Sequence, residues 1–194
     1  MSETATKWVI VGAIIVVVLI YRAVLKRGER RRVQHFNMLA SVLGAKVDTD
    51  SAVFSITLDE RDVEVRDEYR GGGIGANGYG ARYLTIVTPL RGRSLDLHSV
   101  QVKRRFGRST RRLFDEAFAV EEFGLPMRKG WLTADVRSSL EAVIGPGDLY
   151  GRINIEGGDL IYRVIGSPQR FSPDSLRSLV GHLVRLAAAT ERAC

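Results

Sequence analysis

Three groups of residues in this chain have side chains and spacing that could do chemistry. The first is a basic run that places six positive charges within ten positions, with Phe106 among them. Such a run can hold the phosphates of lipids, nucleotides or nucleic acid. The candidate anion- or partner-binding residues are Lys103, Arg104, Arg105, Arg108, Arg111 and Arg112. The alternative is a solvated face whose charge is offset by the acidic stretch Asp48–Glu68.

The second group is a glycine cluster that contains the pattern G-x-G-x-x-G. In a dinucleotide site this pattern joins a strand to a helix, whose N-terminus carries the pyrophosphate. Here the next segment, Arg82–Pro89, has the composition of a strand, so no helix dipole would face a phosphate. We expect instead a long flexible loop that could become ordered on a partner. Its glycines are Gly71, Gly72, Gly73, Gly75, Gly78 and Gly80.

The third group is the pair Asp96 and His98, whose spacing places both side chains on one face of a strand. A metal or an acid–base pair could use this spacing, but no third or fourth ligand can be named. A surface pair is the simpler interpretation. No serine lies in a nucleophile elbow, because Gly166-Ser167-Pro168 lacks the following glycine. We therefore expect no catalytic residue, no metal and no cofactor, and a protein that is not an enzyme.

The element that precedes these groups is an apolar run from Trp8 to Ile20, in which ten of thirteen residues are Val, Ile or Leu. Up to Tyr21 it gives about 21 Å of helix, and up to Leu25 about 27 Å, against a hydrocarbon core of about 30 Å. A basic run follows it and is expected to contact anionic lipid headgroups. The residues of this second run are Arg22, Lys26, Arg27, Arg30, Arg31 and Arg32.

This pattern predicts a single N-terminal transmembrane helix over residues 8–25, in the inner (plasma) membrane of a bacterial-type cell. Residues 1–7 would lie outside and the rest in the cytoplasm, because positive charge favours the cytoplasmic side. The alternative is a cleaved signal peptide. Two features oppose it: the basic residues follow the apolar run, and no small-x-small cleavage site comes after Tyr21.

The net charge of +7 is concentrated near the N-terminus. Residues 1–33 carry +5 and residues 34–194 only +2, so the basic character is poor evidence for nucleic-acid binding. The only cysteine is Cys194, which excludes a disulfide framework.

The remaining sequence predicts an α+β fold, with an antiparallel-sheet domain and two or three helices over residues 45–194. Residues 26–44 would form a basic amphipathic helix that ends at Gly44. Two hairpins are expected, one from 52–58 and 63–69 around the turn 59–62, the other from 83–89 and 94–102. Residues 109–123 fit either a helix lined by Leu113, Phe114, Ala117 and Phe118 or a short strand near 117–122, and we favour the strand.

The C-terminal half gives clearer boundaries. Thr133 can cap a helix over 134–144, and Gly157-Gly158 is a two-residue hairpin turn between strands 149–156 and 159–165. Ser172-Pro173 begins a last helix with a continuous apolar face.

These features favour a non-catalytic docking or scaffold module, anchored to a membrane and belonging to a larger assembly. Its expected partners are membrane lipid and another protein, and nucleic acid is not expected. The alternative is a membrane-proximal sensor that binds a lipid headgroup or a nucleotide through the basic run 103–112.

Overall fold

The computed structural model describes residues 3–48, 52–70, 80–91, 98–104, 117–124, 127–145 and 151–194, with the side chains of the first helix described from Ile14 onward. The described helices are α1 (Glu3–Val42), α3 (Ala134–Val143), the short 3-10 helix η2 (Pro168–Arg170) and α4 (Pro173–Ala193). The described strands are β1 (Lys46–Asp48), β2 (Val53–Leu58), β3 (Arg61–Arg70), β4 (Ala81–Pro89), β5 (His98–Arg104), β6 (Phe118–Gly124), β7 (Arg152–Glu156) and β8 (Asp159–Ile165).

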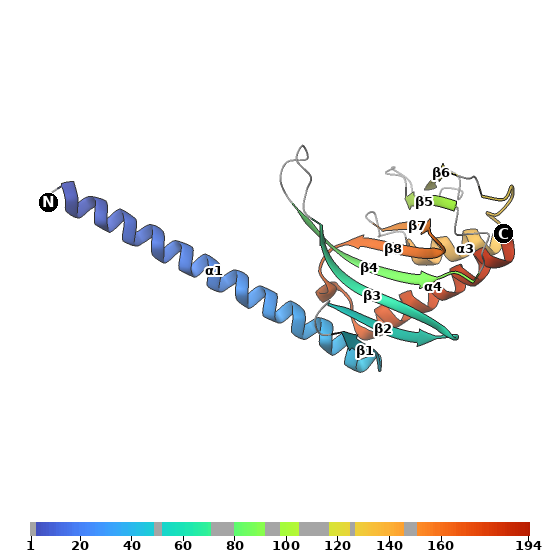
Figure 1. Cartoon of the computed structure of the whole chain (residues 1–194), viewed down its shortest axis with the longest axis horizontal. Helices are drawn as coiled ribbons and strands as arrows, with labels where there is room; N and C mark the ends of the chain where they lie inside the picture. Colours follow the sequence, from blue (N-terminus) through green and yellow to red (C-terminus); the bar gives the residue numbers. More distant parts are fainter. Residues whose placement is uncertain are drawn as a thin grey trace.

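The strands form one antiparallel sheet in the order β1-β2-β3-β4-β8-β7-β5-β6, so the predicted α+β class is correct. Helix α4 packs against β4 and β8, and α3 packs against α4 (Figure 1). Strand residues alternate between this helix-covered face and the opposite one, which we call the open face. On β3, Val63 and Val65 point into the core, whereas Glu64 and Arg66 lie on the open face.

Local sequence signals fix several boundaries as predicted. The hairpin of β2 and β3 forms as predicted, but its turn is shorter than the expected 59–62: Asp59 and Glu60, both with positive φ, make a two-residue turn, and β3 begins at Arg61. Gly157 and Gly158 also have positive φ, in the two-residue turn between β7 and β8. The Thr133 side chain accepts a hydrogen bond from the Val136 N–H and caps α3.

The last helix begins where Ser172 and Ser175 form a reciprocal capping box. The predicted strand near 117–122 is confirmed by β6, and Gly44, with φ of +67°, follows the end of α1.

The predicted hairpin between 83–89 and 94–102 is wrong. Strand β4 pairs with β3 and β8, whereas β5 lies between β7 and β6. The physical reason lies in β4, where every side chain from Leu84 to Thr88 is buried on one face or the other. Such a strand needs neighbours and cover on both sides, and the β7–β8 hairpin supplies the second neighbour.

The expectation of an N-terminal transmembrane helix is corrected as well. Among the residues that the structure describes, no helix is long and apolar enough to cross a membrane. Between Lys7 and Arg22, α1 has fourteen residues without charge. As a helix they span about 21 Å, which is shorter than a hydrocarbon core of about 30 Å.

The last three turns of α1 dock on the domain. Phe36, Leu39 and Ala40 are buried, and the ring of Phe36 lies 4.7 Å from that of Phe54 on β2. The His35 Nε2 atom lies 3.1 Å from the carbonyl oxygen of Phe171, just after η2. Val33 is exposed, so the docked face of α1 is centred on Phe36, Leu39 and Ala40.

A buried ion-pair network holds this part of α1 against the sheet. Arg32 on α1 pairs with Asp67 on β3, whose carboxylate is fully buried, and also with Glu29 one turn earlier on α1. Arg82 on β4 completes the network, since its guanidinium lies 3.3 Å from Asp67 and 3.4 Å from Glu29. Four charges of alternating sign are thereby matched where α1 meets β3 and β4.

A second buried ion pair joins β3 to α4 at the opposite end of the domain. Arg61, at the start of β3, makes two hydrogen bonds of 2.6 and 2.7 Å to Glu191 near the end of α4. Arg61 also donates to the carbonyl of Pro89, and the backbone N–H of Arg91 donates to Glu191. Burial alone would raise the pKa of Glu191, but these hydrogen bonds and positive charges outweigh it, so the pKa lies below the usual carboxyl value.

The first prediction concerns Asp67→Asn. It leaves Arg32 without its buried counter-ion, so we expect the free energy of unfolding to fall by about 3–5 kcal/mol. Urea denaturation at neutral pH measures this loss. Glu64→Gln is the matched control, because the pair between Glu64 and Arg66 is half-exposed and worth at most about 1 kcal/mol. Equal effects of the two substitutions would contradict the assigned role.

The second prediction concerns pH. A lowered carboxyl pKa stabilises the fold above the unfolded-state value of about 4.3, and this contribution is lost as pH falls through the folded-state value. We therefore expect Glu191→Gln to be less stable than wild type at pH 7, and the gap to narrow between about pH 5 and pH 3. Urea titrations across this range measure the gap. A gap that stays constant would show that Glu191 does not act through its charge.

Candidate functional site

A row of cationic side chains crosses the open face of the sheet. Strand register places Arg66 opposite Thr85, Thr85 opposite Arg163, Arg163 opposite Arg152 and Arg152 opposite Lys103. The row therefore runs over five adjacent strands, β3, β4, β8, β7 and β5. Directly opposed residues on neighbouring strands lie about 4.5–5.5 Å apart at Cβ, and like charges there are destabilising. We call this row the cationic row.

The ends of the cationic row are neutralised by neighbours, but its centre is not. Arg66 pairs with Glu64 on the same strand, and Lys103 pairs with Glu121 on β6. In the described part of the chain neither Arg152 nor Arg163 has a carboxylate within ion-pair distance. Two buried polar atoms there, Arg163 Nε and Thr85 Oγ1, also have no hydrogen-bond partner among the described residues.

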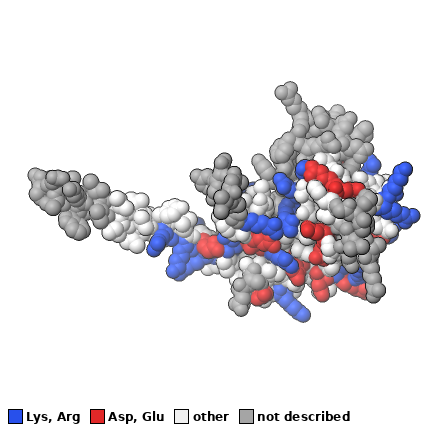
Figure 2. Space-filling model, turned by 45° about the horizontal axis from the view of Figure 1, so that its top comes forward, with Lys and Arg blue, Asp and Glu red and all other residues white. Residues whose placement is uncertain are grey.

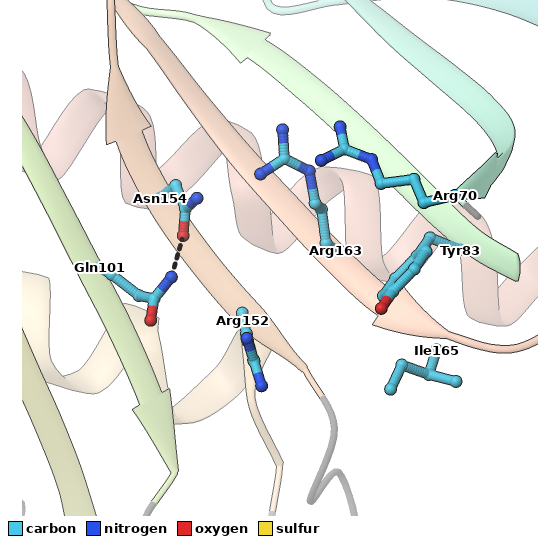
Figure 3. A pocket seen from close by; sticks show the side chains of 7 residues that line it. All are labelled: Arg70, Tyr83, Gln101, Arg152, Asn154, Arg163 and Ile165. Atoms are coloured by element: carbon cyan, nitrogen blue, oxygen red, sulfur yellow. Dashed lines mark hydrogen bonds between the residues drawn. The ribbon is translucent and has the colours of Figure 1, made fainter. Parts of the chain in front are cut away.

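A small cavity opens at the centre of the row, with a volume of about 140 Å³. Figure 3 shows the guanidinium groups of Arg70 and Arg163 side by side, with the Arg152 side chain on β7 extending the opposite way and helices behind the sheet. The lining side chains are Arg70, Tyr83, Gln101, Arg152, Asn154, Arg163 and Ile165. We call this the arginine cavity.

Amide groups form one wall of the arginine cavity. The Gln101 Nε2 atom lies 3.2 Å from Asn154 Oδ1, the contact drawn in Figure 3. In the alternative orientation of the Asn154 amide, its oxygen accepts from Arg163 Nη1 at 3.1 Å and its nitrogen lies 3.2 Å from Gln101 Nε2. Asn154 thus stands between the amide of Gln101 and the guanidinium of Arg163, and each of these groups has donors left for a ligand.

The electrostatics of the cavity are set by crowding of positive charge. Burial lowers the pKa of the Arg163 guanidinium, and the nearby charges of Arg70 and Arg66 lower it further, whereas Glu68 and Glu156 act in the opposite direction. Arg70 is offset by Glu68 at 3.1 Å. A guanidinium stays protonated in proteins, so the cavity holds an excess of positive charge.

The basic run predicted from the sequence lies largely beyond what the structure describes. Lys103 lies on β5, in the cationic row, and the backbone of Arg104 ends that strand. Arg105, Arg108, Arg111 and Arg112 are outside the described residues, so the use of this run remains a prediction. Of the six residues of the basic run, Lys103 therefore lies beside the arginine cavity, opposite Arg152.

The predicted glycine loop has only one described member, since Gly71, Gly72, Gly73, Gly75 and Gly78 fall outside the described residues. Gly80 lies directly under the ring of Tyr69, and a Cβ built there would meet the Tyr69 hydroxyl at 2.2 Å. Gly80 therefore has a packing role at the start of β4.

The predicted headgroup-binding residues divide into two sets. Arg32 is buried in its pair with Asp67 and holds α1 to the sheet. The other five lie exposed on α1 and form what we call the basic collar: Arg22, Lys26, Arg27, Arg30 and Arg31. Figure 2 shows this collar as a blue cluster between the white apolar part of α1 and the domain.

The remaining candidate residues are the Asp96–His98 pair and Cys194. Asp96 is outside the described residues, and only the backbone of His98 is described, at the start of β5. Across the described residues no three His, Cys, Asp or Glu side chains are grouped to hold a metal ion. Cys194 is half-buried at the end of α4, and burial raises the pKa of its thiol.

The sequence analysis missed Arg152 and Arg163, although the chain contains the signal that pairs them. A two-residue turn at Gly157-Gly158 sets Glu156 opposite Asp159, and counting back along both strands sets Arg152 opposite Arg163. Arg70 and Tyr83 enter the cavity from β3 and β4, and their approach depends on the pairing of β4 with β8. That pairing joins strands about eighty positions apart.

Comparison with protein-family models, with curated proteins and with solved structures finds no match to this chain. Its class is therefore defined by its own features: an antiparallel α+β domain, an N-terminal helix that leads away from it, and an open sheet face with a cationic centre.

Proposed function

We propose that this chain is a non-catalytic docking module, held at a lipid membrane by α1 and presenting its α+β domain to another protein of a larger assembly. The observation that carries the proposal is the surface of α1. Seven consecutive apolar side chains, Ile14 to Ile20, are each 45–65 % exposed. Because a helix turns by about 100° per residue, these side chains cover every side of it.

A helix that is apolar all round needs an apolar medium. The basic collar follows this segment directly, and anionic headgroups attract such charges by about 1 kcal/mol each. A lipid membrane offers hydrocarbon for the apolar side chains and anionic headgroups for the basic collar, in the order in which the two occur along the helix. We refer to Ile14–Tyr21 as the apolar segment.

Helix α1 passes from the apolar segment to the sheet without a break, and the Arg32–Asp67 pair fixes it there. A domain attached in this way has a defined orientation relative to lipid, which suits a protein that presents a surface to a partner. Phe123 marks a candidate contact, because it is 53 % exposed on the open face of β6. Among the described strands β6 is the last of the sheet, and such edges are common sites of protein pairing.

The third prediction tests lipid contact. We expect Val17→Asp to weaken binding of the full chain to phosphatidylcholine–phosphatidylglycerol vesicles by at least about fiftyfold, because a carboxylate in hydrocarbon costs about 2.5–3.5 kcal/mol. Vesicle flotation measures the bound fraction. Val42→Asp is the matched control, since Val42 is also exposed on α1 but lies at its domain end. No vesicle binding by wild type, or equal losses in both variants, would contradict the proposal.

The fourth prediction tests docking. We expect the full chain, purified from its own membranes in mild detergent, to carry a protein partner in stoichiometric amount, and Phe123→Glu to lose it. Val47→Glu is the matched control, because Val47 is exposed on β1 at the other edge of the sheet. Quantitative mass spectrometry of the eluates measures the ratio. A chain recovered alone, or a partner retained equally by both variants, would count against docking at β6.

A further inference from the structure

We propose that the arginine cavity is a binding site for a single phosphate group, either inorganic phosphate or the terminal group of a phosphate monoester. The proposal goes beyond docking and lipid contact, since it concerns the open face of the sheet. It starts from the arrangement of charge: Arg163 lies opposite Arg152, and Arg152 lies opposite Lys103.

Without an anion, this arrangement is unfavourable. Cross-strand neighbours of like charge repel, whereas the helix-covered face of the same sheet matches Arg32, Arg82 and Arg61 with carboxylates. Among the arginine side chains that the structure describes on the strands, the two without a carboxylate within ion-pair distance, Arg152 and Arg163, both line this cavity. A bound anion would remove the repulsion between them.

The charge of the cavity selects a dianion. Three arginines line it, and Glu68 offsets Arg70, which leaves Arg152 and Arg163 as two positive charges. A phosphate monoester carries about −1.5 to −2 at neutral pH. A carboxylate would neutralise only one of the two guanidinium groups.

The donors of the cavity select an oxyanion with several acceptors. Guanidinium groups make paired N–H···O bonds to phosphate, and the Gln101 amide and the Tyr83 hydroxyl add neutral donors from opposite sides of the cavity. The Arg163 Nε atom has no hydrogen-bond partner among the described residues. Its N–H is therefore available to one of the three terminal phosphate oxygens.

The size of the cavity limits the ligand to one group. Pockets that enclose a drug-sized molecule have volumes of about 300–1,000 Å³. At about 140 Å³ the arginine cavity is well below this range, so it fits a phosphate group but not a nucleotide. The rest of a monoester would project into solvent above the open face.

The test is isothermal titration calorimetry of the full chain in detergent with inorganic phosphate at pH 7.5. We expect saturable binding with one site per chain. Arg163→Gln and Arg152→Gln should each weaken it about tenfold or more, because a hydrogen bond to a charged group contributes about 1.5–3 kcal/mol. Binding should also weaken between about pH 7.5 and pH 5, because phosphate loses its second negative charge near pH 6.

The matched control is Arg66→Gln. Arg66 belongs to the cationic row and shares its face and charge, but it is paired with Glu64 and lies outside the cavity. We expect it to weaken phosphate binding less than about threefold, as a change in long-range field alone would. The Arg152→Gln variant should melt no lower than wild type, since it removes two repulsive neighbours. A loss of phosphate binding in that variant therefore cannot be attributed to unfolding.

A second experiment distinguishes a lipid headgroup from a free phosphate compound as the ligand of the cavity. Vesicles with phosphatidic acid present a monoester at a lipid surface, and vesicles with phosphatidylglycerol present a diester of the same sign. If the cavity serves a lipid headgroup, Arg163→Gln reduces binding to the first kind only, and inorganic phosphate competes with it. If the cavity serves a free phosphate compound, both vesicles bind Arg163→Gln like wild type while the calorimetric loss remains. No saturable phosphate binding by wild type, or equal losses in the Arg66 and Arg163 variants, would overturn the proposal.

Discussion

The buried pair between Arg32 and Asp67 determines how the two parts of this protein are joined. Helix α1 has little apolar surface for the domain: among its described side chains, Phe36, Leu39 and Ala40 are the buried hydrophobic ones, all within its last turns. A contact this small would leave the helix free to pivot, because few side chains would have to separate. The buried carboxylate prevents this, since any movement of Arg32 away from Asp67 exposes an unmatched charge to a low dielectric. The orientation of the helix N-terminal to Arg32 therefore depends on this pair, together with the contact between Glu29 and Arg82.

The two faces of the sheet differ in how their arginine side chains are paired with carboxylates. On the helix-covered face, Arg32, Arg82 and Arg61 each contact a carboxylate, and the pairs lie where elements must meet. On the open face, Arg152 and Arg163 are opposed without such a partner among the described residues. Arg152 and Arg163 lie opposite each other on adjacent strands, and exchanging one of them for a neutral residue would remove the repulsion, so stability alone does not favour the pair. The contrast between the faces is the reason for assigning binding to the open one.

The sequence predicted the local parts of this fold well and its long-range parts poorly. Turns at Asp59-Glu60 and Gly157-Gly158, the cap at Thr133 and the start of α4 at Ser172 depend on neighbouring residues, whose preferences can be read directly. The position of β5 depends on which of several apolar strands covers which edge of β4, and no local pattern encodes that choice. The arginine cavity needs five strands in register, so only the pairing of Arg152 with Arg163 was accessible from the sequence. The buried role of Arg32 was hidden because it stands in a run of otherwise exposed basic residues.

Because α1 is continuous, its length fixes both the distance and the rotation between the apolar segment and the domain. The helix runs through Gly28 without interruption, so each residue between the apolar segment and Arg32 adds about 1.5 Å of length and about 100° of rotation. A one-residue insertion there would turn the domain by more than a quarter circle relative to the apolar segment while hardly changing its distance. A seven-residue insertion would lengthen the spacer by about 10 Å and restore the original facing to within about 20°. Homologous chains that share the same geometry should therefore differ in this spacer by whole numbers of helical repeats.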